Sequence, residues 1–207
     1  YGGSGGNGGA TSGNGGNGGQ AGGAGDGVVN LSFVTNASGL RLNMPRAVGF
    51  SADGRYLLVA EYSDVSQAAR IGYYDTLNNY QYVQSYGIGG RATAMTVDAA
   101  TTVIYIATSD TQPTVSVVSS PGIVMNINVN VTDLSGIAVS SAGYIYVASP
   151  TDNTVTVINA NTERVAATIN VGNAPSGVII DPVTGYVLVA NSNTGTVTEI
   201  DSATNTL

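Results

Sequence analysis

The chain has 207 residues, enough for one or two domains, with 43% hydrophobic and only 9% charged residues. Ser, Thr, Asn and Gly carry most of its polarity, which suits strand surfaces and turns better than the exposed faces of helices. The net charge is −7, lysine does not occur and the six arginines are scattered, so the composition excludes the grouped cations with which proteins bind nucleic acids.

Three residue types that carry much of enzyme chemistry do not occur in the sequence. Without cysteine the chain can form no disulfide, iron–sulfur cluster or thiolate zinc site. Without histidine it has no imidazole base and lacks the usual ligand of transition metals. Without lysine it can form no Schiff base. No apolar run approaches the roughly 20 residues of a membrane span. We therefore expect no enzyme activity, no cofactor, no metal site and no membrane span.

Residues 1–27 differ in composition from everything that follows. They consist mainly of Gly-Gly-x triplets and offer almost no apolar side chains to bury. One interpretation is a flexible linker, because glycine loses the most entropy on ordering. The other is an extended helix of three residues per turn that packs in an assembly, which the period of three allows. The chain opens with Tyr1 and not with Met, so we expect a processed form or a segment of a longer protein.

A single predicted strand and a connection follow at residues 28–45. The stretch VVNLSFV, residues 28–34, is rich in β-branched residues and has the pattern of a strand that stands alone. Its apolar residues are the candidates for pairing with another strand: Val28, Val29, Leu31, Phe33 and Val34.

From residue 46 onward the sequence repeats itself four times, in units of about 42 residues. Equivalent alanines at 60, 107, 148 and 190 are 47, 41 and 42 residues apart. Equivalent apolar residues at 71, 115, 155 and 197 are 44, 40 and 42 residues apart. The units span approximately residues 46–90, 91–131, 132–172 and 173–207.

Each unit has the pattern of short strands joined by tight turns. Its second strand is apolar on both faces, as in YLLVA, IYIA, IYVA and VLVA, which is typical of a strand buried between neighbouring sheets. Predicted strands include 80–86 in the first unit and 123–131 in the second. Four strands per unit at this period predict an all-β fold, a β-propeller of about four blades.

The last two units carry a family resemblance. The stretches NTVTVIN, ATINVGNAPSGV and YVLVANSNTGTVTEIDSATN resemble the YVTN-type β-propeller repeats of bacterial and archaeal surface proteins. The resemblance covers about 160 residues from Arg46 and is looser in the first two units. The glycine-rich segment resembles that of mycobacterial PE-PGRS proteins. These resemblances imply an extracellular or cell-surface location.

The number of blades leaves the closure of the ring open. YVTN-type propellers usually have seven blades, whereas this chain has three full units and a fourth that lacks its outer strand. The strand at 28–34 could complete the fourth blade within one chain, or complete the last blade of a neighbouring copy in a head-to-tail arrangement. A piece of a larger propeller is the third alternative.

The carboxylates and loop amides are expected to serve the turns of the repeat. Asp53, Asp98 and Asp181 occupy equivalent hairpin positions, and Asp75 and Asp201 equivalent turns, where side chains commonly bond to nearby backbone amides. Two further stretches, Asp152-Asn153 and residues 191–193, could ligate calcium through oxygen, but neither has a dense acidic loop. We expect them to be ordinary loop residues.

Five tyrosines gather in the first unit and form the most unusual local feature, a candidate contact face: Tyr73, Tyr74, Tyr80, Tyr82 and Tyr86. Packing between neighbouring strands is the simpler interpretation. Tyrosine is also favoured at interfaces, which makes binding of carbohydrate or protein the alternative.

Three Asn-x-Ser/Thr triplets make Asn30, Asn36 and Asn130 candidate glycosylation sites. Taken together, the sequence favours a structural, non-enzymatic protein that self-assembles into a filament or coat, with copies of itself as partners. The alternative is a recognition or adhesion protein that binds glycans or protein through the tyrosine-rich blade.

Overall fold

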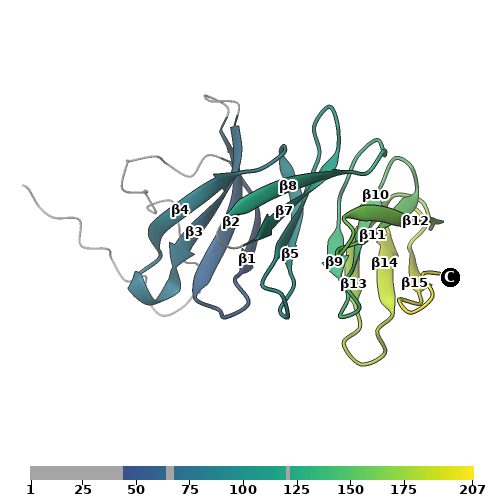
Figure 1. Ribbon diagram of the computed structural model, residues 1–207. Helices are drawn as coiled ribbons and strands as arrows, with labels where there is room; N and C mark the ends of the chain where they lie inside the picture. The colour runs from purple at the N-terminus through teal and green to yellow at the C-terminus, as the bar shows by residue number, and fades with distance from the viewer. Residues whose placement is uncertain (1–43, 64–67, 120–121) are drawn as a thin grey trace, which may run out of the picture. The chain divides into compact units, whose positions relative to one another are not determined.

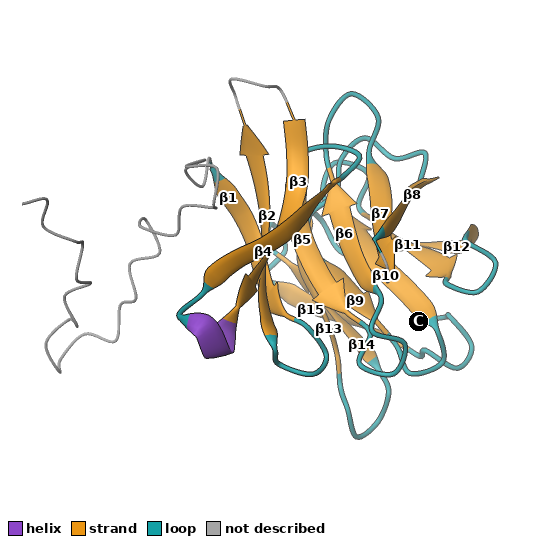
Figure 2. Cartoon of the chain, turned by 60° about the vertical axis from the view of Figure 1, so that its left-hand side comes forward, coloured by secondary structure: helices purple, strands orange, loops and turns teal. Residues whose placement is uncertain are grey.

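The computed structural model describes residues 44–63, 68–119 and 122–207, and confirms the prediction of an all-β chain (Figure 1). The only helix among the described residues is one turn of 3₁₀ helix at Thr76–Asn78, drawn in purple in Figure 2. No helix in this part of the chain is long and apolar enough to cross a membrane. The glycine-rich segment 1–27 and the predicted strand 28–34 lie outside the described residues.

The strands form four antiparallel sheets, each made of strands that follow one another in the chain. The first sheet contains β1 (Pro45–Phe50), β2 (Tyr56–Ser63), β3 (Ala68–Asp75) and β4 (Gln81–Gly87). The second contains β5 (Ala92–Val97), β6 (Ile104–Thr108), β7 (Thr114–Ser119) and β8 (Ile123–Asn128). The third contains β9 (Ile137–Val139), β10 (Tyr144–Ser149), β11 (Thr154–Asn159) and β12 (Arg164–Asn170). The fourth contains β13 (Pro175–Ile180), β14 (Val187–Asn191) and β15 (Thr196–Ile200).

Turn residues with left-handed backbone shorten two of the predicted strands. The strand predicted over 80–86 begins at Gln81, because Asn79 and Tyr80 both have positive φ, 49° and 55°, and belong to the turn. The strand predicted over 123–131 ends at Asn128, and Asn130 has a φ of 49°. Left-handed backbone cannot continue a strand, and it is what asparagine tolerates better than most residues.

Three hydrophobic clusters join the sheets in chain order. One joins the first sheet to the second, one the second to the third, and one the third to the fourth. We call the side of a sheet that faces the next one its forward face, and the opposite side its rear face. The forward face of the third sheet, for example, presents Tyr146, Ala148 and Val155 to Val178 and Val189 on the rear face of the fourth. The second strands of the two middle sheets, β6 and β10, are apolar on both sides because both their faces are buried in this way.

The third and fourth sheets approach so closely that one position between them requires glycine. A Cβ atom built on Gly136, which directly precedes β9, would lie 2.8 Å from the Ser176 carbonyl oxygen and 2.8 Å from the Val178 amide nitrogen. The equivalent residue of the fourth sheet is Gly177, and a Cβ there would meet nothing within 4 Å. This contrast marks the forward face of the fourth sheet as uncovered.

Candidate functional site

The five tyrosines of the candidate contact face are divided between the two sides of the first sheet. Tyr73 and Tyr74 are neighbours on β3 and therefore point to opposite faces. A bulge in β4 between the partners of these two residues pairs Tyr73 with Gln84 but Tyr74 with Tyr82. The bulge places Tyr86 on the forward face with Tyr73, and Tyr82 on the rear face with Tyr74.

On the forward face, Tyr73 and Tyr86 meet Tyr56 from β2. The Tyr73 ring contacts the Tyr56 ring with centroids 6.0 Å apart at 70°, and the Tyr86 ring with centroids 5.7 Å apart at 88°. Both contacts are edge-to-face, the arrangement that aromatic quadrupoles favour. Burial raises the pKa of Tyr73 to about 12, so its hydroxyl stays protonated into the alkaline range where an exposed tyrosine ionises.

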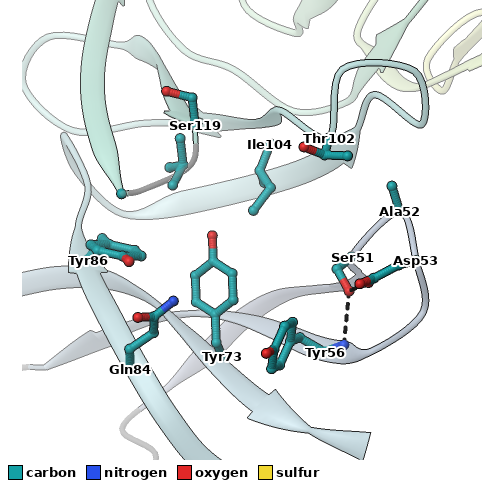
Figure 3. A pocket seen from close by; sticks show the side chains of 12 residues that line it. Ser51, Ala52, Asp53, Tyr56, Tyr73, Gln84, Tyr86, Thr102, Ile104 and Ser119 are labelled. Carbon is teal, nitrogen blue, oxygen red and sulfur yellow. Dashed lines mark hydrogen bonds between the residues drawn. The ribbon is translucent and has the colours of Figure 1, made fainter.

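These three rings line a pocket of about 440 Å³ between the first and second sheets (Figure 3). Tyr73 stands in the middle, with Tyr86 and Tyr56 on either side of it. The remaining walls come from the β1–β2 turn, from β4 and from the second sheet: Ser51, Ala52, Asp53, Gln84, Thr102, Ile104, Val118, Ser119 and Gly122. The pocket thus combines aromatic rings with neutral polar groups and one carboxylate.

The carboxylate at the mouth of the pocket is held by its own turn. Asp53 accepts hydrogen bonds from the Ser51 hydroxyl at 2.6 Å and from the Arg55 backbone amide at 3.0 Å. The Ser51 hydroxyl oxygen in turn accepts a bond from the Tyr56 amide at 2.9 Å. The Ser51 and Arg55 bonds lower the pKa of Asp53, so this side chain is an ionised acceptor at neutral pH.

The repeat explains why a pocket occurs between these two sheets. In the second and third sheets a tyrosine on the second strand faces a valine on the third, as in the pairs Tyr105–Val117 and Tyr146–Val157. In the first sheet the pair is reversed, because Leu58 lies opposite Tyr73. In the first sheet the tyrosine ring therefore lies on the third strand, β3, and not on the second, and there it contacts Tyr56 and Tyr86. Tyr56 is not among the five predicted tyrosines, and the repeat does not single it out, because the equivalent positions are Val103, Tyr144 and Tyr186.

On the rear face of the first sheet, Tyr74 and Tyr82 form a separate pair. Their centroids are 5.8 Å apart, and the Tyr74 ring lies over Gly72, whose built Cβ would be 3.0 Å from its Cε2 atom. Burial and then the charge of Glu61 raise the pKa of Tyr74 to about 12. Glu61 is itself buried and paired with Arg70 at 2.6 Å. Tyr80 lies apart from both pairs, in the β3–β4 turn.

The forward face of the fourth sheet is apolar and exposed. Ala190 and Val197 are equivalent to Ala148 and Val155 of the third sheet, both of which are fully buried. Here Val197 on β15 is 65% exposed, and Ile179 on β13, on the same face of the sheet, is 62% exposed. The face that the other three sheets bury against a neighbour is therefore open to solvent in the fourth.

The outer edge of β15 is also open among the described residues. In the first three sheets the third strand pairs on both sides, whereas β15 pairs with β14 only, apart from a bridge between Asp201 and Thr206 beyond its end. The candidate strand residues Val28, Val29, Leu31, Phe33 and Val34 lie outside the described residues, as do the acceptor candidates Asn30 and Asn36. The third acceptor candidate, Asn130, is exposed in the connection between β8 and β9.

The repeated aspartates have the turn-forming role that the sequence predicts. Each accepts a hydrogen bond of 2.8 to 3.0 Å from the backbone amide two residues further on, which confirms the prediction for Asp53, Asp75, Asp98, Asp181 and Asp201. The two calcium candidates also hold loops together. Asp152 accepts bonds from the Thr132 amide and hydroxyl, Asn153 accepts one from the Ala174 amide, and Asn191 donates to Thr196 and Thr198. In the described part of the chain, no three acidic side chains converge on a point where a metal ion could bind.

Comparison with known proteins finds similarity in structure but not in sequence. No protein family and no curated protein matches the chain. Among solved structures, hydrazine synthase from Kuenenia stuttgartiensis superposes with a TM-score of 0.69 at 16% identity, over 77% of this chain and 59% of that one. A functionally unknown protein from Desulfotomaculum acetoxidans superposes with a TM-score of 0.58 at 13% identity, over 75% of this chain and 55% of that one. The chain thus spans somewhat more than half the length of these neighbours, and at such identities the likeness concerns the fold alone.

Proposed function

We propose that the four sheets are blades of a YVTN-type β-propeller, and that the chain is a non-enzymatic, extracellular or cell-surface protein that associates head to tail with copies of itself. The observation that carries this proposal is the open forward face of the fourth sheet. Its residues Ala190 and Val197 occupy positions that are fully buried in the other three sheets, and Ile179 adds a third exposed apolar side chain to the same face. Burying an apolar surface of this kind against a further sheet lowers the free energy, so docking is favourable.

The rear face of the first sheet supplies the complementary surface. It is the one rear face among the described sheets that no preceding sheet covers, and it presents Val48, 64% exposed, and Phe50, 56% exposed, beside the Tyr74–Tyr82 pair. A second copy that places this face on the fourth sheet would repeat the contact made by consecutive sheets. Because the two surfaces differ, the association is heterologous and can be propagated into a ring or a filament.

The order of the chain links the strand at 28–34 to the same contact. Each outer strand, β4, β8 or β12, directly precedes the inner strand of the next sheet. The segment 28–34 precedes β1 in the same way, so it has the place of the outer strand of whichever sheet docks on the first. It would then pair with β15 of the neighbouring copy, or of its own chain if the ring closes. The glycine-rich segment 1–27, with its resemblance to PE-PGRS proteins, would extend from this junction as a surface or assembly segment.

Two charge substitutions on opposite faces test the head-to-tail arrangement. Ile179→Glu blocks the fourth sheet and Val48→Glu blocks the first, and both side chains are exposed enough to leave the folded monomer intact. We expect the unmodified chain to form oligomers whose mass rises with concentration in light scattering, and filaments or rings in negative-stain images. Each variant alone should be monomeric. An equimolar mixture should stop at dimers, because each variant retains the face that the other has lost.

The control is Val183→Glu, which changes a 90% exposed valine in the β13–β14 turn and should leave association unaltered. A chain that stays monomeric at every concentration would contradict the proposal. Dimers formed by the single variants would point to a symmetric contact instead.

The lack of cysteine makes strand donation directly measurable. Val197→Cys is combined in turn with Leu31→Cys and Phe33→Cys, and the pairs are oxidised. A cross-linked dimer supports donation between copies, and a cross-linked monomer supports closure within one chain. If neither double variant cross-links faster than the single Val197→Cys variant, the segment does not pair with β15.

A second candidate function rests on the pocket between the first two sheets. Three tyrosines and several neutral polar groups converge there, which favours recognition of a ligand, carbohydrate or protein, in adhesion. NMR signals of Tyr56, Tyr73 and Tyr86 that shift and reach a plateau as a cell-surface glycan extract is added would support this candidate.

A further inference from the structure

We propose that the pocket between the first and second sheets binds a single neutral pyranose ring, free or at the end of a glycan. This inference refines the recognition candidate above and does not depend on association between copies. It rests on the three edge-to-face tyrosines, on the kind of polar groups around them and on the charge of the walls.

The size and the aromatic lining suit a sugar ring. A volume of about 440 Å³ falls within the range of small-ligand sites. The Tyr73 ring stands at 70° to the Tyr56 ring and at 88° to the Tyr86 ring. The walls that the three rings build are therefore apolar and angled, and do not form a single flat platform. The C–H faces of a pyranose can lie on such rings while its hydroxyls point away toward polar groups.

The polar groups supply both donors and acceptors. The Tyr73 hydroxyl is protonated at neutral pH and can donate, and the Gln84 amide beside it both donates and accepts. Asp53 is an ionised acceptor, and the hydroxyls of Thr102 and Ser119 can do either. A neutral polyol, in which every hydroxyl is both donor and acceptor, matches this mixture.

The charge of the walls argues against an anionic ligand. Among the described lining residues the one charged group is the Asp53 carboxylate, and the whole chain has a net charge of −7. The Arg55 guanidinium lies nearby, 5.6 Å from the centroid of the Tyr56 ring, but it is already paired with Asp75 at 2.9 Å. Phosphorylated and carboxylated ligands would therefore meet the Asp53 charge and a cation that is already engaged. A quaternary ammonium ion would be attracted by the rings and by Asp53, so it is the competing ligand that an experiment must separate from a sugar.

The Ile179→Glu chain is the protein to use, because it separates binding from association. Saturation-transfer NMR is recorded with methyl glucopyranoside, galactopyranoside and mannopyranoside, and separately with tetramethylammonium. Tyrosine emission gives a second readout, because the chain contains no tryptophan to mask it. We expect transfer to the ring protons of at least one glycoside and a saturable change in emission.

Three variants locate the site. Tyr73→Phe and Gln84→Ala should each weaken binding about fivefold, as expected for the loss of one hydrogen bond. Tyr86→Ala should weaken it about tenfold or more. Tyr82→Phe is the matched control, since it removes a tyrosine hydroxyl from the opposite face of the same sheet and should change nothing.

The proposal is overturned if no glycoside shows transfer, if tetramethylammonium alone binds, or if Tyr73→Phe and Tyr82→Phe have the same effect. Because Ile179→Glu is monomeric under the head-to-tail proposal, oligomers of this variant would contradict that proposal while leaving the sugar assignment to be judged on binding.

Discussion

At the scale of single residues, the same position of the repeat has different requirements in different sheets, according to what covers it. Gly136 and Gly177 both precede or begin an inner strand and pair with equivalent alanines, Ala148 and Ala190. Only Gly136 faces the backbone of a following sheet. The glycine is therefore needed for the approach of two sheets and not for the strand itself, whose backbone has no positive φ at either position.

Substitution of these two glycines by alanine should have unequal effects. Gly136→Ala places a methyl group within 3 Å of the Ser176 and Val178 backbone, and we expect it to destabilise the fold by about 1–3 kcal/mol. Gly177→Ala meets open space and should change the free energy of unfolding by less than about 0.5 kcal/mol. Urea unfolding of dilute, monomeric protein measures both. Equal destabilisation would show that the clash at Gly136 is relieved by a shift of the strand.

Three tyrosines with raised pKa values predict a loss of stability in alkali. Burial raises the pKa of Tyr73, Tyr74 and Tyr146 to about 12, whereas an unfolded tyrosine ionises near 10. Below pH 10 these groups are neutral in both states, so their contribution is fully present. Between pH 10 and about 12 only the unfolded state loses the protons, so the free energy of unfolding falls with rising pH. Phenolate absorbance should show a late-ionising group of tyrosines that becomes exposed together with unfolding, and a single titration near pH 10 in the folded protein would contradict this.

At the scale of strands and sheets, the repeat predicts more of the fold than of the site. The apolar second strands and the aspartate turns indicate four similar antiparallel sheets, because each strand's pattern is local and each turn is made by one side chain. The grouping of Tyr73 with Tyr74, Tyr82 and Tyr86 could not be resolved in the same way. The bulge in β4 changes which face each following side chain occupies. A register shift recurs at the equivalent place in the third sheet, between Val157 and Ile158, but not in the second, so the repeat alone does not predict it. Gln84 pairs with Tyr73, and Tyr56 contacts Tyr73 from β2; both line the pocket only because the first sheet packs against the second.

The exchange of Leu58 and Tyr73 can be reversed to test how the pocket arises. Leu58→Tyr alone adds a ring opposite Tyr73 and should overpack the interface, and Tyr73→Val alone should leave a cavity, each costing about 1–3 kcal/mol. The double variant recreates the Tyr–Val pairs of the second and third sheets. We expect the double variant to lose about 1–2 kcal/mol less unfolding free energy than the two single variants lose together, as a double-mutant cycle would measure. We also expect it to bind no glycoside. Additive effects would mean that the two positions do not share one space.

At the scale of the whole molecule, each described sheet packs its forward face against the rear face of the next. Two unlike faces remain that no described sheet covers, the rear face of the first sheet and the forward face of the fourth. The rear face of the first sheet contains the buried Glu61–Arg70 pair beneath its tyrosines, and the forward face of the fourth contains Glu199 among apolar neighbours. Valine occupies the position of Glu199 in both middle sheets, as Val117 and Val157. A charge pointing from an otherwise apolar sheet face weakens its association, as charged residues on exposed strands commonly do.

Glu199→Val should therefore strengthen association between copies. The substitution removes the desolvation cost of one carboxylate from the docking face and lowers the repulsion between chains of net charge −7. We expect the dissociation constant to fall about tenfold, which corresponds to about 1.4 kcal/mol. Higher salt should also favour association of the unmodified chain, because screening weakens the repulsion while leaving apolar contacts intact. Sedimentation velocity at two salt concentrations measures both effects, with Glu163→Gln as the control, because it removes the charge of an exposed glutamate in the β11–β12 turn without placing a β-branched residue at its φ of 57°. If Glu163→Gln strengthens association as much as Glu199→Val, net charge governs the contact and the forward face of the fourth sheet does not form it.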